Sequence, residues 1–266
     1  MRSGGWAWAL LAATAAHAGC TRSIQVPMAP VGLSVSFDGQ RSGGNYPTLL
    51  REMGAAIGCE FVIQRVPRAR LQKMFESGEA DLLMPASMSP SREDDGEFVP
   101  LIQVRAGLLT LLREQPSPRS LAELIARPGY KVAVVRGFSF GAAYDQAMAV
   151  LRTQHRLVEE TDPAGVARAL RLGLAQGCVM TASIFIGTLV REPELAPLMK
   201  QLRVEPLEEL GWSESGLYLS RRSLDEADRR TLRTAFAQAA RSGRVWQLFN
   251  DAYPPGSLTG SIRPLP

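Results

Sequence analysis

Residues 66–94 read VPRARLQKMFESGEADLLMPASMSPSRED and contain, in order, the signals of a helix, a strand and a second helix. Apolar side chains recur at helical spacing over Arg68–Ser77, so this part is expected to form an amphipathic helix that ends at Gly78. The apolar run Ala80–Met84 is typical of a buried parallel strand. Ser89-Pro90 then supplies a serine N-cap and a first-turn proline, which predicts the start of another helix.

Arg92 falls in the first turn of this second helix, where the helix macrodipole disfavours a cation. Two interpretations account for it. The acidic residues that follow, Glu93, Asp94 and Asp95, could compensate the charge. Alternatively, Arg92 and the free backbone N–H groups of the helix start could hold a bound anion. The sequence alone leaves both interpretations open.

The segment is similar to one part of the bacterial extracellular solute-binding proteins of the polar amino-acid type (family 3). That family reads roughly helix–G–x–x–D–strand–loop–T–P–x–R, and this chain has Gly78-Glu79-Ala80-Asp81, the strand, and Ser89-Pro90-Ser91-Arg92. In the family the arginine pairs with the carboxylate of the ligand, and the Thr or Ser three residues earlier assists. The resemblance therefore implies these two roles for Arg92 and Ser89.

The rest of the chain contains two similar β-α-β-α-β units, the first from Ile24 to Met84 and the second from Lys131 to Met180. Ala106–Leu112 resembles the first hinge strand of the family, and Gly216–Ser220 resembles its return crossing. The resemblance implies an α/β, two-lobed periplasmic-binding-protein-like fold (type II), in which two hinge crossings join lobes that are each a helix-covered, mostly parallel sheet. The expected segments are a signal peptide (1–18), lobe 1 (19–108), lobe 2 (109–210), and a return to lobe 1 with the C-terminal helices (211–266).

Three helix starts carry N-cap signals. Ser120-Leu121-Ala122-Glu123 and Ser223-Leu224-Asp225-Glu226 both read as capping boxes, and Asp162-Pro163 reads as a capping aspartate followed by a first-turn proline. The residues that follow Tyr253-Pro254 are expected to form a loose tail.

The composition describes an ordinary globular protein of 266 residues, 45% of them hydrophobic and 21% charged. The net charge of +4 is mild, and no basic cluster is interleaved with aromatic residues, so nucleic-acid binding is not expected. The two histidines, His17 and His155, and the cysteines lack the spacing of a metal site. No metal and no cofactor are therefore expected, and the chain is expected to be a monomer.

Met1–Ala18 resembles a signal peptide, with Arg2 as its basic start, an apolar core over Trp6–Ala16 and an A-x-A cleavage site. This predicts export to the periplasm. Ala18-Gly19-Cys20 also resembles the end of a lipoprotein box, which would place a lipid anchor on Cys20. That alternative ranks second, because His17 stands where the box usually has leucine.

Three cysteines remain after cleavage behind Ala18. Cys20 precedes the first expected strand and Cys59 begins the second, so neighbouring parallel strands would bring the two together. In an oxidising compartment we expect them to form a disulfide. Cys178 lies in an apolar strand and is expected to be a buried free thiol.

The resemblance also implies further ligand contacts. The loop Arg136-Gly137-Phe138-Ser139 resembles the family's "k-G-t-t" loop of lobe 2, in which the residue matching Ser139 offers its hydroxyl and backbone N–H to the ligand carboxylate. Ser87 lies close to Ser89 along the chain. Arg70 matches a "v-P-x-x-R" pattern at the cleft rim, although it could equally face solvent, and the loop could equally be an ordinary strand-to-helix turn.

The departures from the family concern the ligand's amino group. Gln176 and Thr181 fall where the family usually has two aspartates, the second of which binds the α-amino group. A threonine hydroxyl does not replace a carboxylate as the counter-ion of an ammonium group. Up to three arginines, Arg92, Arg136 and Arg70, without an obvious acid favour a small carboxylate or another anion.

The sequence therefore predicts an exported solute-binding protein that captures a small anionic solute, either an amino acid or another small carboxylate, in an interlobe cleft for an ABC-type transporter. The chain carries no catalytic motif of the common kinds, so an enzyme is not expected. Three alternatives stay open. They are a ligand-sensing module that docks on a membrane sensor, a hydro-lyase-like periplasmic enzyme on the same fold, and a degenerate pair of lobes kept for protein contacts.

Overall fold

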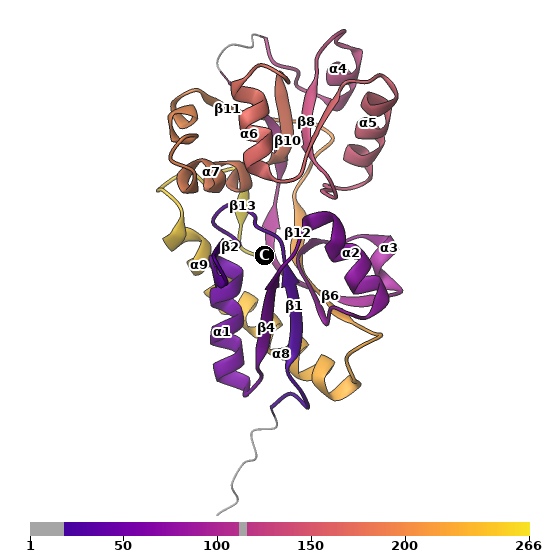
Figure 1. Ribbon diagram of the computed structural model, residues 1–266, viewed down its shortest axis with the longest axis vertical. Helices are drawn as coiled ribbons and strands as arrows, with labels where there is room; N and C mark the ends of the chain where they lie inside the picture. Colours follow the sequence, from indigo (N-terminus) through magenta and orange to yellow (C-terminus); the bar gives the residue numbers. More distant parts are fainter. Residues whose placement is uncertain (1–18, 112–115) are drawn as a thin grey trace, which may run out of the picture.

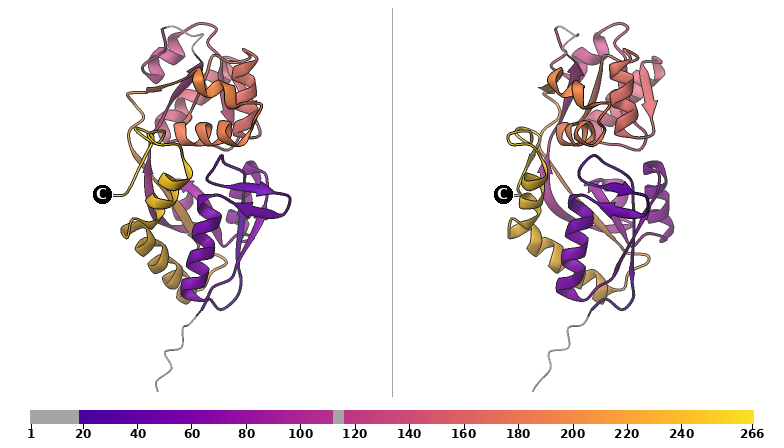
Figure 2. Two further views of the ribbon diagram at one scale, coloured as in Figure 1. Left: turned by 90° about the vertical axis from the view of Figure 1, so that its left-hand side faces the viewer. Right: turned by 60° about the vertical axis from the view of Figure 1, so that its left-hand side comes forward.

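The computed structural model describes residues 19–111 and 116–266. The described residues form two α/β lobes stacked along the long axis of the molecule and joined at a narrow waist (Figures 1 and 2). The described chain starts in lobe 1, passes into lobe 2 and returns to lobe 1.

Lobe 1 consists of two sheets and the helices that cover them. A parallel pair joins β1 to β4, and an antiparallel four-stranded sheet has the order β13-β6-β12-β5. A short hairpin, β2-β3, precedes the first helix. The elements of lobe 1 are β1 (Ile24–Met28), β2 (Ser36–Asp38), β3 (Arg41–Gly43), α1 (Asn45–Ile57), β4 (Phe61–Arg65), α2 (Arg68–Ser77), β5 (Leu82–Ser87), α3 (Pro90–Glu93), β6 (Gly96–Val104), β12 (Ser213–Ser220), α8 (Glu226–Arg241), α9 (Arg244–Ala252) and β13 (Ile262–Arg263).

Lobe 2 is built on one five-stranded sheet of order β11-β7-β10-β8-β9. The strands β10, β8 and β9 run parallel, whereas β7 is antiparallel to both of its neighbours. The elements of lobe 2 are β7 (Ala106–Leu111), α4 (Leu121–Ala126), β8 (Val132–Val135), α5 (Ala142–Thr153), β9 (Leu157–Glu160), α6 (Pro163–Arg171), β10 (Gly177–Thr181), α7 (Ala182–Arg191), the 3₁₀ helix η1 (Ala196–Lys200) and β11 (Leu202–Pro206).

The sheets are mixed rather than mostly parallel. The expected parallel strand at Ala80–Met84 corresponds to β5, whose paired neighbour is β12, and the two strands run antiparallel. An apolar run signals burial on both faces of a strand, but it carries no information on the direction of the neighbouring strands. Here the neighbour is supplied by the chain returning from lobe 2.

Two crossings connect the lobes. The first leads from β6 to β7 through Arg105, and the second leads from β11 to β12 through residues 207–212. Gly216–Ser220, which resembles a return crossing, lies further on, inside β12 of the lobe 1 sheet.

The helix caps agree with the sequence in two of three cases. Ser120 accepts a hydrogen bond from the Glu123 amide and begins α4, and Asp162 accepts one from the Gly165 amide and begins α6. The capping box expected at Ser223 is wrong. Asp225 caps α8 instead, and the Ser223 hydroxyl donates to a carboxylate oxygen of Asp81 at 2.6 Å.

The disulfide Cys20–Cys59 is confirmed. It joins the beginnings of β1 and β4, which pair in parallel. A Cys20 sulfur in this bond is not available for the lipid anchor considered above. Cys178 is a free cysteine within β10 and is fully buried, and burial raises the pKa of its thiol.

The chain after α9 is not a loose tail. Leu258, Ser261 and Ile262 are buried, and Ile262 pairs with Val104 in the lobe 1 sheet. The carbonyl of Ser261 accepts from the Arg105 amide at 2.9 Å, and its hydroxyl oxygen accepts from the Ser183 amide of α7 at 3.0 Å. The C-terminal segment therefore touches lobe 1, the first crossing and lobe 2 together.

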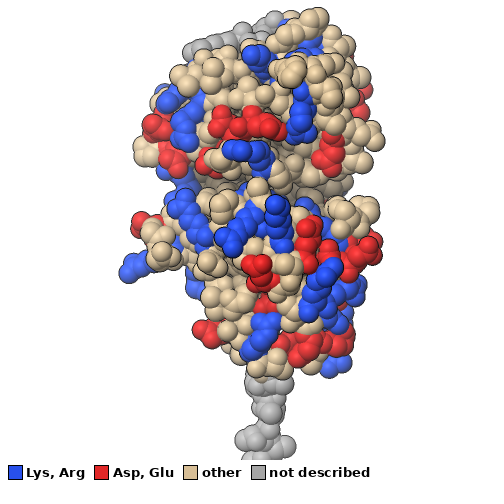
Figure 3. All heavy atoms as spheres, turned by 45° about the vertical axis from the view of Figure 1, so that its right-hand side comes forward, with Lys and Arg blue, Asp and Glu red and all other residues tan. Residues whose placement is uncertain are grey.

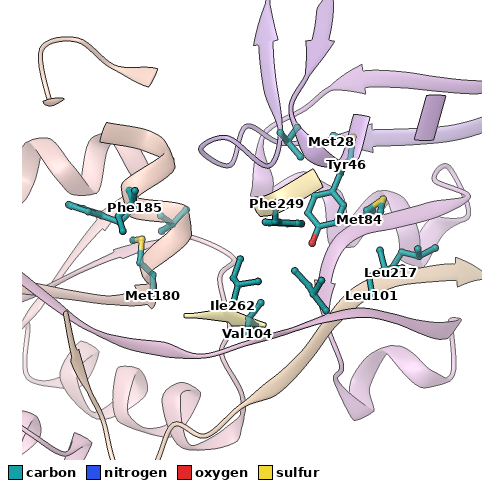
Figure 4. Packing of buried hydrophobic residues seen from close by; sticks show 14 of the residues in the cluster. Met28, Tyr46, Met84, Leu101, Val104, Met180, Phe185, Leu217, Phe249 and Ile262 are labelled. Atoms are coloured by element: carbon teal, nitrogen blue, oxygen red, sulfur yellow. The ribbon is translucent and has the colours of Figure 1, made fainter. Parts of the chain in front are cut away.

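Apolar packing is continuous across the waist. Figure 4 shows Ile262 beside Val104, with Phe249 of lobe 1 on one side and Met180 and Phe185 of lobe 2 on the other. No helix within the described residues is long and apolar enough to cross a membrane. The expected signal peptide, residues 1–18, lies outside the described part of the chain.

Candidate functional site

A cavity of about 70 Å³ lies between the lobes at the waist. Its floor comes from the crossing strands and the C-terminal segment, through Ile102, Val104 and Ile262. Lobe 1 contributes the polar side chains Ser34, Tyr46, Arg68, Ser87 and Ser215. Lobe 2 contributes Ser139, Thr181 and Ser183, together with the rings of Phe138 and Phe140.

The lobes touch on two sides of this cavity. On one side, the Arg68 guanidinium of α2 lies 5.6 Å from the ring centroid of Phe138 in lobe 2. On the other side, the loop after β1 packs on α7, so that a methyl group added to Gly187 would lie 2.6 Å from the Leu33 amide nitrogen. The structure is therefore in a closed arrangement, with the cavity between the two contacts.

Arg68 is the one charged residue among the described residues that line the cavity. It is the first residue of α2, whose first turn contains no acidic residue. Its Nη1 donates to the carbonyl of Pro85 at 3.1 Å, and no ion pair found in the described residues includes it. Burial, and to a smaller extent the neighbouring charge of Arg92, lower the pKa of Arg68 to about 10. The side chain is therefore a cation at neutral pH without a carboxylate partner.

Arg92 lies behind the cavity wall rather than in the wall. Its Nε donates to the side-chain oxygen of Gln72 at 2.8 Å, and its Nη1 donates to the carbonyl of Ser87 at 3.0 Å. A smaller cavity of about 50 Å³ is lined by Arg92, Gln72 and Arg68. Burial is the main cause of the lowered pKa of Arg92. Arg92 thus fixes the end of β5 and adds positive potential next to Arg68.

The sequence-based set of site residues is only partly brought together. Ser87, Ser139 and Thr181 line the cavity. Ser89 does not line it, and the Ser89 amide and carbonyl instead bond the Tyr218 hydroxyl.

Like Arg92, the other two arginines of that set do not line the cavity. Arg70 and Arg136 are exposed and line none of the cavities described here. The amide of Arg136 bonds the carbonyl of Glu160.

Two acidic residues near the cavity, Asp145 and Asp162, hold other roles. Asp145 lies in the first turn of α5 and accepts a hydrogen bond from the Ser139 hydroxyl at 2.8 Å. Asp162 caps α6 and lines an outer groove of about 330 Å³, which Arg65, Arg68 and Phe138 also line. Among the described residues that line the inner cavity, none is Asp or Glu.

The outer groove leads along the waist. In the space-filling view of Figure 3 the surface is hollowed at the waist, and basic side chains gather on its lobe 1 side. Since Arg68 and Phe138 line both the groove and the inner cavity, this pair stands between the two spaces.

Tyr46 is a neutral hydrogen-bonding group in the cavity wall. It is buried at the start of α1, packs edge-on against Phe249 and shares a hydrogen bond with Ser215. Burial raises the pKa of its phenol well above the ordinary value, so the hydroxyl stays protonated at neutral pH.

Sequence reasoning missed Arg68, Tyr46, Ser183 and Ile262. The argument that a first-turn cation needs compensation was applied to Arg92, and it holds equally for Arg68, which directly follows Pro67. Nothing in the sequence signalled Ile262, since its place in the wall depends on the return of the C-terminal segment to the waist.

No protein-family model and no curated protein sequence matches the chain. The fold is nevertheless similar to solved structures. A histidine kinase sensor domain with similarity to periplasmic binding proteins matches with a TM-score of 0.69 at 18% identity, covering 91% of this chain and 98% of that chain.

Two amino-acid-binding structures match similarly. The GluR0 ligand-binding core from Nostoc punctiforme, in complex with L-glutamate, has a TM-score of 0.67 at 18% identity and covers 87% of this chain and 100% of its own. The amino-acid transporter substrate-binding protein AbpA from Streptococcus pneumoniae, bound to L-arginine, has a TM-score of 0.66 at 17% identity, with 86% and 94% covered. At such identities these matches show the two-lobed, periplasmic-binding-protein-like fold alone, which confirms the expected fold class.

Proposed function

We propose that this chain is an exported solute-binding protein, related to the polar amino-acid type, that captures a small anionic solute between its lobes and delivers it to an ABC-type transporter. The fold is the one that the neighbouring binding proteins use for ligand capture. The disulfide is typical of chains that fold in an oxidising compartment such as the periplasm.

One observation carries the proposal: among the described residues that line the inner cavity, one is a half-buried arginine and none is an acid. A partly desolvated guanidinium without a counter-ion is unfavourable, and a ligand carboxylate supplies the missing charge in a bidentate geometry. The hydroxyls of Ser87 and Thr181 can complete its hydrogen bonds, whereas the Ser139 hydroxyl already donates to Asp145. Because these hydroxyls come from both lobes, an anion that engages them favours the closed arrangement.

The cavity lining supports binding better than chemistry. Among the described residues that line it there is no Asp, Glu, His or Cys to act as acid, base or nucleophile. In the proposed cycle, closure around the solute presents a joint surface of the two lobes to the transporter, and the protein acts as a monomer.

A sensor role is the second candidate, because a histidine kinase sensor domain matches over nearly its whole length. The ligand cavity would work in the same way there. The partner of the closed form would be a membrane receptor instead of a permease.

The test is a thermal-shift screen of the chain from Gly19 onward against common amino acids, small mono- and dicarboxylates, and polyamines. A ligand at a hundred times its dissociation constant stabilises the fold by about 2.7 kcal/mol, which corresponds to several degrees for a protein of this size. We expect shifts from carboxylates and none from polyamines. A shift from polyamines alone contradicts the proposal.

The screen is then repeated with Arg68→Gln and Arg92→Gln. Loss of the charge-assisted pair should weaken carboxylate binding by about 10- to 100-fold in Arg68→Gln. Arg92→Gln should weaken it less, since Arg92 acts through the Ser87 carbonyl and through its charge. Equal affinities of Arg68→Gln and the unmodified protein, measured by calorimetry, would remove Arg68 from the site.

A further inference from the structure

The inner cavity also distinguishes between classes of anion. An amino acid brings an ammonium group next to its carboxylate, so a site for amino acids must neutralise both charges. Here the described lining supplies one cation and hydroxyl groups, but no carboxylate. An ammonium group enclosed in this space would lack a counter-ion and would lie near the charge of Arg68.

Thr181 occupies the position that decides this point. It is the last residue of β10, its side chain is 3% exposed, and it lines the cavity. Thr181 is the N-cap residue of α7, but its side chain makes no capping hydrogen bond, and no other hydrogen bond of this side chain is found among the described residues. A hydroxyl at this position can bond a ligand oxygen but brings no negative charge.

The wall also has an apolar part. Ile184 of α7, Phe249 of α9 and Ile262 of β13 line the cavity from lobe 2, lobe 1 and the C-terminal segment. Figure 4 shows Phe249 and Ile262. Val104 of the first crossing lies beside Ile262. A volume of about 70 Å³ accepts about five water molecules, or an organic group of similar size.

Resting on the proposed function, we infer that the ligand is a small monocarboxylate without an α-ammonium group, held by Arg68 and with an aliphatic body against Ile184, Phe249 and Ile262. A 2-oxo or 2-hydroxy substituent fits the class, because the cavity hydroxyls can hydrogen-bond it. A second carboxylate does not fit, since Arg68 is the one cation of the described wall.

The test uses matched pairs that share a carbon skeleton. Acetate is compared with glycine, propanoate with L-alanine, 3-methylbutanoate with L-valine, and 4-methylpentanoate with L-leucine. Dissociation constants are measured by calorimetry at pH 7 on the chain from Gly19 onward. We expect the carboxylate of the best-binding pair to bind at least about tenfold more tightly than its amino acid.

The outcomes separate the two proposals. If an amino acid binds as tightly as its carboxylate partner or more tightly, the inference on ligand class is wrong and the anion-binding function stands. If glutarate binds more tightly than every monocarboxylate, the class is again wrong. If no member of any pair and no dicarboxylate binds, the proposed function itself fails.

Thr181→Asp provides an independent test, because it should reverse the preference between the carboxylate and the amino acid. Thr181→Val is its control. A carboxylate at this position supplies the missing counter-ion, so we expect the preference within the best pair to shift at least tenfold toward the amino acid. Thr181→Val should keep the preference for the plain carboxylate. A folded Thr181→Asp protein with an unchanged preference would contradict the inference, and if this variant does not fold, the matched pairs decide alone.

Discussion

Asp81 shows how one side chain connects distant parts of lobe 1. It is 1% exposed, and its carboxylate accepts bonds from both Nη atoms of Arg22, each at 2.6 Å, from the Gln25 amide and from the Ser223 hydroxyl. Burial opposes ionisation of Asp81, but these bonds outweigh it and hold the pKa of the carboxyl below its usual range. The residue thus joins the start of β1, the start of β5 and the loop before α8.

We expect Asp81→Asn to lower the free energy of unfolding at neutral pH by about 2 kcal/mol, because the amide cannot accept all four bonds. A carboxyl whose pKa is lower in the folded than in the unfolded state stabilises the fold above about pH 4 and loses this effect as the pH falls through the folded value. Urea titrations should therefore show the difference between the two proteins at pH 7, and show it shrinking at pH 3. Glu159→Gln, in the exposed pair with Arg152, is the control and should change stability little.

At the scale of elements, the C-terminal segment both lines the inner cavity and connects the two lobes. Ile262 of this segment lines the inner cavity, and the Ser261 hydroxyl oxygen accepts a hydrogen bond from the Ser183 amide of lobe 2. The Arg263 guanidinium stacks on Trp212 of the second crossing, 4.2 Å from the ring centroid. The Arg263 side chain also bonds Gln103 of β6. One short segment therefore contacts both crossings.

Ser261→Ala should destabilise the protein by about 1–3 kcal/mol, because the buried Ser183 amide loses its acceptor. The measurement is the melting temperature, and ligand affinity is expected to fall with it, since the N-terminus of α7 lines the cavity. Ser257→Ala is a matched control in the same segment, where the hydroxyl bonds only the nearby carbonyl of Pro254. Equal melting temperatures of the two variants would show that the bond to lobe 2 contributes nothing.

At the scale of the whole molecule, the closed arrangement depends on two glycines of different lobes. Gly32, in the loop after β1, adopts a left-handed backbone conformation with φ of 50° and lies against the backbone of α7. A methyl group added to Gly187 on that helix would meet the Leu33 amide at 2.6 Å and the Tyr253 hydroxyl at 3.0 Å. The lobes approach this closely because both residues lack a side chain.

Gly187→Ala should therefore open the cleft, even though alanine is intrinsically better in a helix by about 1 kcal/mol. Small-angle X-ray scattering should give a larger radius of gyration, and carboxylate affinity should fall. Val190→Ala on the same helix, at an exposed position, should change neither quantity. A variant Gly187→Ala with unchanged scattering and affinity would show that this contact does not control closure.

The sequence contained most of the architecture. Local sequence patterns placed α2, β5 and the start of α3, and the strand starts at Cys20 and Cys59 gave the disulfide. The hairpin β2-β3 and the strand β13 were not predicted. The direction of the strands was harder to predict from the sequence, because β5 pairs with β12, which follows the return of the chain from lobe 2. The cap of α8 was missed because Ser223 is drawn to Asp81, a residue far away along the chain.

The site was only half predictable for a similar reason. The resemblance implied Ser139 and Thr181, and closeness to Ser89 along the chain suggested Ser87; all three line the cavity. Which arginine faces the cavity depends on side-chain packing, and here Gln72 and the Ser87 carbonyl hold Arg92 behind the wall. No local pattern reveals that choice.

The position of the two ends has a practical consequence for building a biosensor. The described chain begins at the tip of lobe 1, far from the cleft, and ends beside the waist (Figure 1). An immobilising tag at the first end leaves the moving parts untouched. A fluorescent dye on the last residues would be attached to the segment that touches both lobes. If the lobes close around a solute as proposed, the surroundings of the dye would change, and its fluorescence would report solute binding.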